Sequence, residues 1–166
     1  MNKSILLIDD DELVVRSLNL LLKKKGYLVE TASNAVEAIS LVATTNFDLV
    51  ISDIRMPGEN GVIAVEKIKR IYDDRNHSCG FFFITGFAEE DTPAHAIRLG
   101  VDKFLFKPFD NELLIKNIEE EFVMIKKQRD LKAGIVGTLD VIKNPVREKL
   151  ISKRVVITGI GVIAPN

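Results

Sequence analysis

Residues 47–58 decide the fold, because they contain a strand-like run, a carboxylate and a loop in immediate succession. They read Phe47-Asp48-Leu49-Val50-Ile51-Ser52-Asp53-Ile54-Arg55-Met56-Pro57-Gly58. The run before Asp53 is mostly apolar, as are strands of a sheet that is covered on both faces, and Pro57-Gly58 predicts a loop. Asp53 is therefore expected at the carboxyl end of a buried strand. In open α/β folds, ligands bind at that edge of the sheet.

Three further apolar runs end in side chains that carry chemistry. Residues 5–8 are followed by Asp9, Asp10 and Asp11, residues 81–84 by Thr85, and residues 104–106 by Lys107 and Pro108. Because parallel strands end at the same edge of a sheet, we expect carboxylates, a hydroxyl and an ammonium to converge there.

Apolar runs alternate with amphipathic stretches from the start of the chain to about residue 127. The expected strands are near 4–8, 27–31, 48–52, 80–84 and 102–106, and the expected helices near 12–25, 34–44, 61–72, 91–99 and 110–127. Gly26 is expected to end the first helix, and Ser33 or Asn34 to begin the second. Strands that alternate with helices imply parallel pairing through right-handed crossovers. We therefore predict an α/β fold with a doubly wound, five-stranded parallel sheet and helices on both faces.

The composition is that of a globular protein from a reducing compartment. The chain has 166 residues, of which 46% are hydrophobic, and a formal net charge of -1. No global field therefore favours nucleic acid or an anionic membrane. Cys79 is the only cysteine, which excludes an internal disulfide. The first residues form neither a signal peptide nor a spanning helix, so a cytoplasmic location is expected.

Asp9, Asp10 and Asp53 form the predicted acidic site. Three carboxylates brought together would raise one another's pKa values, and a hard cation such as Mg²⁺ would remove that conflict. Asp53 would be a nucleophile that forms an acyl phosphate, with the Thr85 hydroxyl and the Lys107 ammonium on the phosphoryl oxygens. The alternative is that Asp9 and Asp10 only cap the following helix and that Asp53 is a solvated loop residue. Thr85 would then be an ordinary strand-end residue, and Lys107 would be solvated.

An ordered set of motifs covers residues 4 to about 125. The motifs are Leu7-Ile8-Asp9-Asp10-Asp11, Asp48-Leu49-Val50-Ile51-Ser52-Asp53-Ile54-Arg55-Met56-Pro57-Gly58-Glu59-Asn60-Gly61, Ile84-Thr85-Gly86 and Phe104-Leu105-Phe106-Lys107-Pro108-Phe109. This set resembles the receiver domain of response regulators, the phosphoacceptor module of two-component signalling. The resemblance implies a flavodoxin-like fold. It also implies a signalling protein, not an enzyme, that assists its own phosphorylation and dephosphorylation.

The resemblance implies a role for each residue of the acidic site. Asp53 would accept a phosphoryl group from a histidine kinase or a histidine phosphotransfer protein. Asp10, Asp53 and the main-chain carbonyl of Arg55 would ligate Mg²⁺ directly, and Asp9 would bind it through water. Lys107 would pair with Asp53 and later with the phosphoryl group.

The resemblance also implies a switch. Thr85 would move toward the phosphoryl group while the ring of Phe104 turns inward, and the face over residues 91–127 would change for a partner or for a homodimer. Position 104 commonly holds tyrosine in this family, so Phe104 could switch only by ring burial. We further expect a cis peptide bond before Pro108 and slow phosphoryl hydrolysis because of the bulk of Phe87.

The chain changes character after the predicted domain. We expect residues 1–127 to be the receiver domain and residues 128–152 to be a linker with partial helix. Residues 153–166 are strongly β-like and resemble the opening strand of β-ketoacyl-carrier-protein synthases. They would be the start of a fused ketosynthase-like output or a disordered tail. The catalytic cysteine and histidines of that family are not present, so no condensing activity is assigned.

A second function stays open at this point. The chain could be a receiver-like interaction module that signals by binding, without phosphorylation, and is attached to a ketosynthase-like output. The complete acidic site argues against that alternative. Neither a nucleic-acid nor a membrane partner is expected, because the residues after the domain show no helix-turn-helix pattern and no basic stripe.

Overall fold

The computed structural model describes residues 3–56, 61–86, 100–138 and 156–158. Its strands are β1 (Ser4–Ile8), β2 (Leu28–Ala32), β3 (Leu49–Asp53), β4 (Gly80–Thr85), β5 (Lys103–Phe106) and β6 (Val156–Thr158). Its helices are α1 (Glu12–Lys24), α2 (Ala35–Thr44), α3 (Gly61–Asp74) and α5 (Asn111–Thr138). The helix expected near 91–99 lies outside the described residues.

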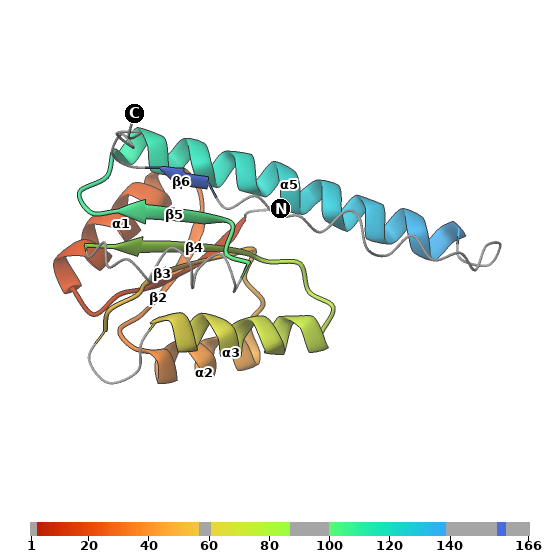
Figure 1. The fold of residues 1–166 in the computed structure, drawn as a ribbon, viewed down its shortest axis with the longest axis horizontal. Coiled ribbons are helices and arrows are strands. Elements are labelled where there is room, and N and C mark those ends of the chain that lie inside the picture. The colour runs from red at the N-terminus through yellow and green to blue at the C-terminus, as the bar shows by residue number, and fades with distance from the viewer. Residues whose placement is uncertain (1–2, 57–60, 87–99, 139–155, 159–166) are drawn as a thin grey trace, which may run out of the picture.

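The strands form one sheet of order β2-β1-β3-β4-β5-β6, in which every pair of neighbours is parallel. Helices α1 and α5 cover one face of this sheet, and α2 and α3 cover the other (Figure 1). The chain leaves β1 outward to β2 and then returns past β1 to β3. The carboxyl ends of β1 and β3 therefore lie at the point where the strand order reverses, which is the ligand-binding position of doubly wound sheets.

The predicted doubly wound fold is confirmed, and each of the five predicted strands is present within one residue of its expected ends. The sequence did not predict that the tail would pair with this sheet. Val156–Thr158 pairs in parallel with β5, and Lys103 is the register partner of Val156. An edge strand such as β5 exposes a row of unpaired backbone groups, which a β-prone segment of the same chain can cover.

Side chains at the helix ends explain where the helices start and stop. The Asp11 carboxylate accepts hydrogen bonds from the first turn of α1, and the Asn34 side chain accepts one from the Glu37 amide at 2.9 Å. Glu37 in turn accepts a hydrogen bond at 2.7 Å from the amide of Ser33, the residue before the N-cap. Gly26 ends α1 with a φ of 88°, a conformation that other residues adopt only with strain.

Helix α5 runs beyond the end near residue 127 that its pattern predicted. The Arg129 guanidinium donates a hydrogen bond to the Ser78 carbonyl oxygen at 2.7 Å and lies 2.8 Å from the Asp48 carboxylate. These contacts anchor the extra turns to the amino-terminal end of the sheet. The first part of the expected linker is therefore helical. No helix among the described residues is long and apolar enough to cross a membrane.

Candidate functional site

Four strand ends place the predicted side chains at one edge of the sheet. Asp53 and Thr85 are the last residues of β3 and β4, and Asp9 directly follows β1. Lys107 directly follows β5, and its amide donates a hydrogen bond to the Thr85 carbonyl oxygen at 2.7 Å, which extends the β4–β5 pairing to the edge. The convergence that parallel pairing predicted is therefore present in the structure.

The Lys107 ammonium contacts two carboxylates at once. Its Nζ atom lies 2.7 Å from Asp9 Oδ2 and 2.7 Å from Asp53 Oδ2. The exposed fractions of the side chains are 21% for Lys107, 3% for Asp9 and 11% for Asp53. The sequence predicted the contact with Asp53 and missed the one with Asp9. One positive charge thus serves two negative charges, and the cluster keeps a net negative charge.

Burial and the contacts within the cluster set the directions of its pKa shifts. Burial raises the pKa of the Asp9 carboxyl above its ordinary value, although its hydrogen bonds with Lys107 and the Asp11 amide act in the opposite direction. Burial alone would lower the pKa of Lys107, but its hydrogen bonds to Asp53 and Asp9 outweigh that effect and raise it. Lys107 is therefore held as a cation.

The backbone around Asp53 is fixed by three hydrogen bonds. The Ser52 hydroxyl donates to the Asp53 carbonyl oxygen at 2.8 Å, the Gly61 amide donates to the Ile54 carbonyl oxygen at 2.9 Å, and the Arg55 amide donates to Asp53 Oδ1 at 3.1 Å. The sequence analysis gave Ser52 and Gly61 no role. A lone hydroxyl in an apolar strand was the available signal for Ser52, because a buried polar group requires a partner.

The alternative in which Asp9 and Asp10 cap the first helix is wrong. Asp11 is the N-cap of α1, and its carboxylate accepts hydrogen bonds from the Leu13 and Val14 amides at 2.9 and 3.3 Å. The Asp9 carboxylate instead accepts a hydrogen bond from the Asp11 amide at 2.9 Å and pairs with Lys107. Asp9 is therefore committed to the cluster and not to the helix.

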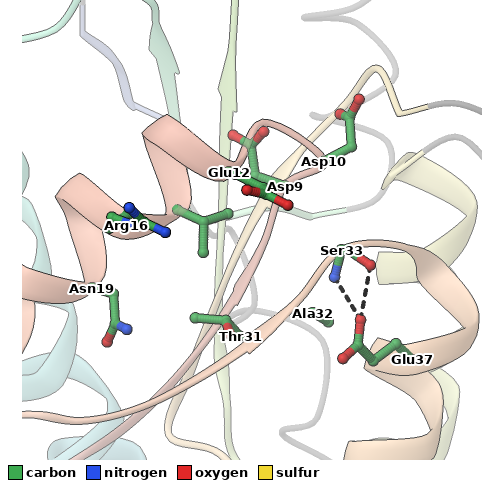
Figure 2. A pocket seen from close by; sticks show the side chains of 10 residues that line it. Asp9, Asp10, Glu12, Arg16, Asn19, Thr31, Ala32, Ser33 and Glu37 are labelled. Carbon is green, nitrogen blue, oxygen red and sulfur yellow. Dashed lines mark hydrogen bonds between the residues drawn. The ribbon is translucent and has the colours of Figure 1, made fainter.

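The Asp10 side chain does not point toward Asp9. It is exposed, and Figure 2 shows its carboxylate pointing away from that of Asp9. Within the described ranges, no group of three or more His, Cys, Asp or Glu side chains is arranged to hold a metal ion. Asp9 and Asp53 nevertheless direct two carboxylate oxygens at one cation, and Mg²⁺ is often bound by one or two carboxylates with water. The donor set therefore fits Mg²⁺ in kind.

A pocket of about 440 Å³ adjoins the site between α1 and the start of α2 (Figure 2). Its lining includes the carboxylates of Asp9, Asp10, Glu12 and Glu37 together with Arg16. This excess of negative charge favours cations over free anions on the α1 side of the site.

The two predicted switch residues are buried on neighbouring strands, Thr85 at the end of β4 and Phe104 within β5. Thr85 is 1% exposed and Phe104 is fully buried. The Phe104 ring meets Phe83 edge-on, at 6.4 Å between centroids, and lies 4.9 Å from Phe106. The ring therefore occupies the inward position in this structure. The cis peptide bond expected before Pro108 is present. Phe87 lies outside the described residues.

The sequence matches the family model of the response regulator receiver domain over residues 5–119. The transcriptional regulatory protein CrdR of Helicobacter pylori is 34% identical over 122 residues, which are 74% of this chain and 56% of that protein. The response regulator SaeR of Staphylococcus aureus is 30% identical over 123 residues, which are 74% of this chain and 52% of that protein. A cyclic di-GMP phosphodiesterase of Thermotoga maritima is 31% identical over 111 residues, which are 67% of this chain and 28% of that protein. The chain thus spans about half of the two regulators and about a quarter of the phosphodiesterase.

Solved structures give the same match. A CheY-like response regulator receiver domain protein from Methanospirillum hungatei JF-1 superimposes with a TM-score of 0.72 at 26% identity, and 77% of this chain and 99% of that chain are covered. The signal receiver domain of an HD domain-containing protein from Pseudomonas fluorescens Pf-5 gives a TM-score of 0.71 at 26% identity, over 76% of this chain and 99% of that chain. These matches give no support to the ketosynthase-like output that the tail suggested.

Proposed function

The chain belongs to the response regulator receiver family, and on that premise we propose that Asp53 is the residue that carries the phosphoryl group. The observation that supports this proposal is the contact of one ammonium, that of Lys107, with both Asp9 and Asp53 at 2.7 Å. A carboxylate that stands at a sheet edge beside a held cation can act as a nucleophile toward an anionic phosphodonor. The chain then acts as a signalling phosphoacceptor and not as an enzyme on a separate substrate.

In the proposed reaction, an oxygen of the Asp53 carboxylate attacks the phosphorus of a phosphohistidine in a histidine kinase or phosphotransfer protein. The P–N bond breaks, its electron pair returns to the imidazole, and an acyl phosphate forms on Asp53. The product carries about 1.5 to 2 negative charges. Lys107 can neutralise part of that charge, because its Nζ atom already lies 2.7 Å from Asp53 Oδ2.

We assign a Mg²⁺ site to the carboxylates of Asp9, Asp10 and Asp53 and the carbonyl oxygen of Arg55. When bound there, Mg²⁺ would offset the charge of the carboxylates and of the phosphoryl oxygens. Asp9 and Asp53 already face one cation, Lys107. The exposed Asp10 side chain must turn to join them.

Thr85 and Phe104 are the residues through which we expect the new charge to change the surface. Thr85 ends β4, and its carbonyl oxygen accepts a hydrogen bond from the Lys107 amide. On β5, Phe106 is the register partner of Thr85, and Phe104 is the register partner of Phe83. A shift of Lys107 toward the phosphoryl group would therefore act on both strands. The face over residues 91–127 is the proposed contact with a partner or a second copy, and signalling requires that the two states bind it with different affinity.

Acetyl phosphate tests the assignment of Asp53. The full chain is incubated with acetyl phosphate and Mg²⁺, and the acyl phosphate is read by ³¹P NMR and by a phosphate-affinity gel. Asp53→Asn should form no adduct. Asp48→Asn is a matched control, because Asp48 lies just before β3 and Asp53 ends it. Absence of an adduct in the wild-type chain would favour the interaction module that signals without phosphorylation.

A further inference from the structure

Gly61, the first residue of α3, lies where a side chain has no space. A β-carbon at this position would overlap the carbonyl oxygen of Asp53 and would lie 2.8 Å from the Ser52 hydroxyl. The φ of Gly61 is not in the left-handed region. Glycine is therefore required here by the close approach of two backbone segments and not by an unusual conformation.

Gly26 provides the opposite case. It has a φ of 88°, and a β-carbon there would meet nothing within 4 Å. An alanine at Gly26 strains the backbone after α1 without touching the site, whereas an alanine at Gly61 must move α3 or the Asp53 peptide group. Glycine is therefore required at Gly26 by the backbone conformation and at Gly61 by the lack of space for a side chain.

Ser52 also holds the same peptide group. Its hydroxyl, which is fully buried, donates to the Asp53 carbonyl oxygen at 2.8 Å. The Gly61 amide holds the next carbonyl, that of Ile54, at 2.9 Å, and the Arg55 amide then reaches Asp53 Oδ1 at 3.1 Å. Each residue from 53 to 55 thus has a backbone group held by a hydrogen bond. The last of these bonds, from the Arg55 amide, ends on the Asp53 carboxylate.

We propose that Ser52 and Gly61 are positioning residues that set the Asp53 carboxylate and the Arg55 backbone for phosphoryl transfer. The proposal rests on the function proposed for Asp53. Lys107 fixes one carboxylate oxygen directly, and Ser52 and Gly61 fix the other through the Arg55 amide. A nucleophile held in this way reacts faster than one that must be oriented during the reaction.

The test compares Gly61→Ala with Gly26→Ala in the full chain. Phosphorylation by acetyl phosphate and Mg²⁺ is measured for both, and urea unfolding identifies conditions in which both are folded. Because a displacement of about 1 Å can cost up to about 100-fold in rate, we expect a fall of about tenfold or more in Gly61→Ala. Gly26→Ala should keep the wild-type rate. Equal rates for folded Gly61→Ala and the wild type would overturn the proposal.

Ser52 variants keep the proposal testable if Gly61→Ala does not fold. Ser52→Ala removes the hydroxyl and should slow phosphorylation, whereas Ser52→Thr retains the hydroxyl and should restore much of the rate. A wild-type rate in folded Ser52→Ala would count against a positioning role.

The ¹⁵N–¹H resonance of the Arg55 amide separates this proposal from the proposed function. That amide donates to the Asp53 carboxylate, so its chemical shift reports the geometry of the unphosphorylated site. It should move in Gly61→Ala and Ser52→Ala and stay constant in Gly26→Ala. If the wild-type chain takes no phosphoryl group at Asp53, the proposed function fails, and the resonance still tests the positioning. An Arg55 amide that is unchanged in both site variants would refute it.

Discussion

The two ends of the sheet each place an aspartate beside a cation, but in different proportions. At the amino-terminal end, Asp48 Oδ2 accepts hydrogen bonds from the Ser4 amide at 2.8 Å and the Ser4 hydroxyl at 3.1 Å, and Arg129 lies 2.8 Å from Oδ1. One carboxylate there has one cation and two further donors. At the carboxyl-terminal end, Asp9 and Asp53 share the single ammonium of Lys107.

The pKa values of the two ends move in opposite directions. Burial alone would raise the pKa of Asp48, but its hydrogen bonds from Ser4 and its contact with Arg129 outweigh burial and lower it. Burial raises the pKa of Asp9 by more than its hydrogen bonds with Lys107 and the Asp11 amide lower it. Asp48 therefore has a cation of its own and two further donors, whereas the cluster of Asp9, Asp53 and Lys107 can accept a further cation.

These directions fix the sign of the pH dependence. The lowered pKa of Asp48 gives stability that is present above the unfolded value of 3.8 and is lost as the pH falls through the folded pKa. The raised pKa of Asp9 gives stability that is present below 3.8 and is lost as the pH rises through the folded pKa. On acidification, Asp48 should lose its stabilising effect on the fold, and Asp9 should lose its destabilising effect.

The largest effect is expected for Lys107→Met, which leaves Asp9 and Asp53 without their cation. Loss of one partner of a buried ion pair costs about 3–5 kcal/mol, and the partial exposure of Lys107 places the expected loss of unfolding free energy at about 3 kcal/mol at pH 7. The penalty should shrink as the pH falls, because the carboxylates take up protons. Urea unfolding at several pH values measures it.

The double variant Asp9→Asn/Lys107→Met is the control for that prediction. In the Lys107→Met background, removal of the Asp9 carboxylate should recover more stability than Asp9→Asn adds to the wild type, because the two residues are in contact and their effects are not additive. Additive effects of the two substitutions would contradict the shared-cation description of this end of the sheet.

A smaller loss is expected for Asp48→Asn at the opposite end. The change weakens the contacts with Ser4 and Arg129, and we expect a loss of about 1 kcal/mol at pH 7. The Arg129 side chain is 42% exposed, so solvent screens the charge contribution and no larger value is expected. Unfolding free energies of the variant and the wild type should converge as the pH falls below about 3.8. A constant difference across the pH range would show that Asp48 contributes through packing alone.

The opposite sign is expected for Asp9→Asn. This change removes a buried carboxylate that lacks a cation of its own, so the unfolding free energy at pH 7 should rise by about 1 kcal/mol. The gain should disappear on acidification, because Asp9 is then protonated in the wild type. Thermal unfolding beside Asp48→Asn provides the comparison. Destabilisation by Asp9→Asn at pH 7 would mean that Lys107 satisfies both carboxylates.

The smallest effect is expected for Lys132→Ala. Lys132 contacts the Asn76 side chain at 3.2 Å at the amino-terminal end, and both residues are exposed. Exposed substitutions of this kind change stability by about 0.5 kcal/mol or less. Urea unfolding of Lys132→Ala beside Asp48→Asn checks this, and equal losses would show that exposure does not separate the two contacts.

Much of the site could be predicted because strand ends are visible in the sequence. Asp9, Asp53, Thr85 and Lys107 each follow or end an apolar run, and parallel pairing brings such ends to one edge. Asp10 was predicted to join the other acids, but its exposed side chain points away from Asp9, because a side chain two residues past the strand can turn to solvent. A side-chain torsion of this kind is not determined by the position of a residue in a pattern.

Two further features depended on contacts between distant parts of the chain. The extra turns of α5 are anchored where Arg129 meets Ser78 and Asp48, and β6 was added where the tail meets the free edge of β5. The periodicity of apolar residues indicates the local preference of a segment, and it does not predict contacts with residues that are distant in the sequence.

The sequence by itself determined the order of the strands and helices and the chemical groups at the edge of the sheet, because the period of apolar residues and the strand ends are local properties. Only the tertiary structure decided that Lys107 serves both Asp9, 98 residues away, and Asp53, 54 residues away. It also decided that Gly61 presses against the Asp53 peptide group. The number of cations for each buried carboxylate and the space left for a β-carbon are set by packing, and packing exists only once the chain has folded.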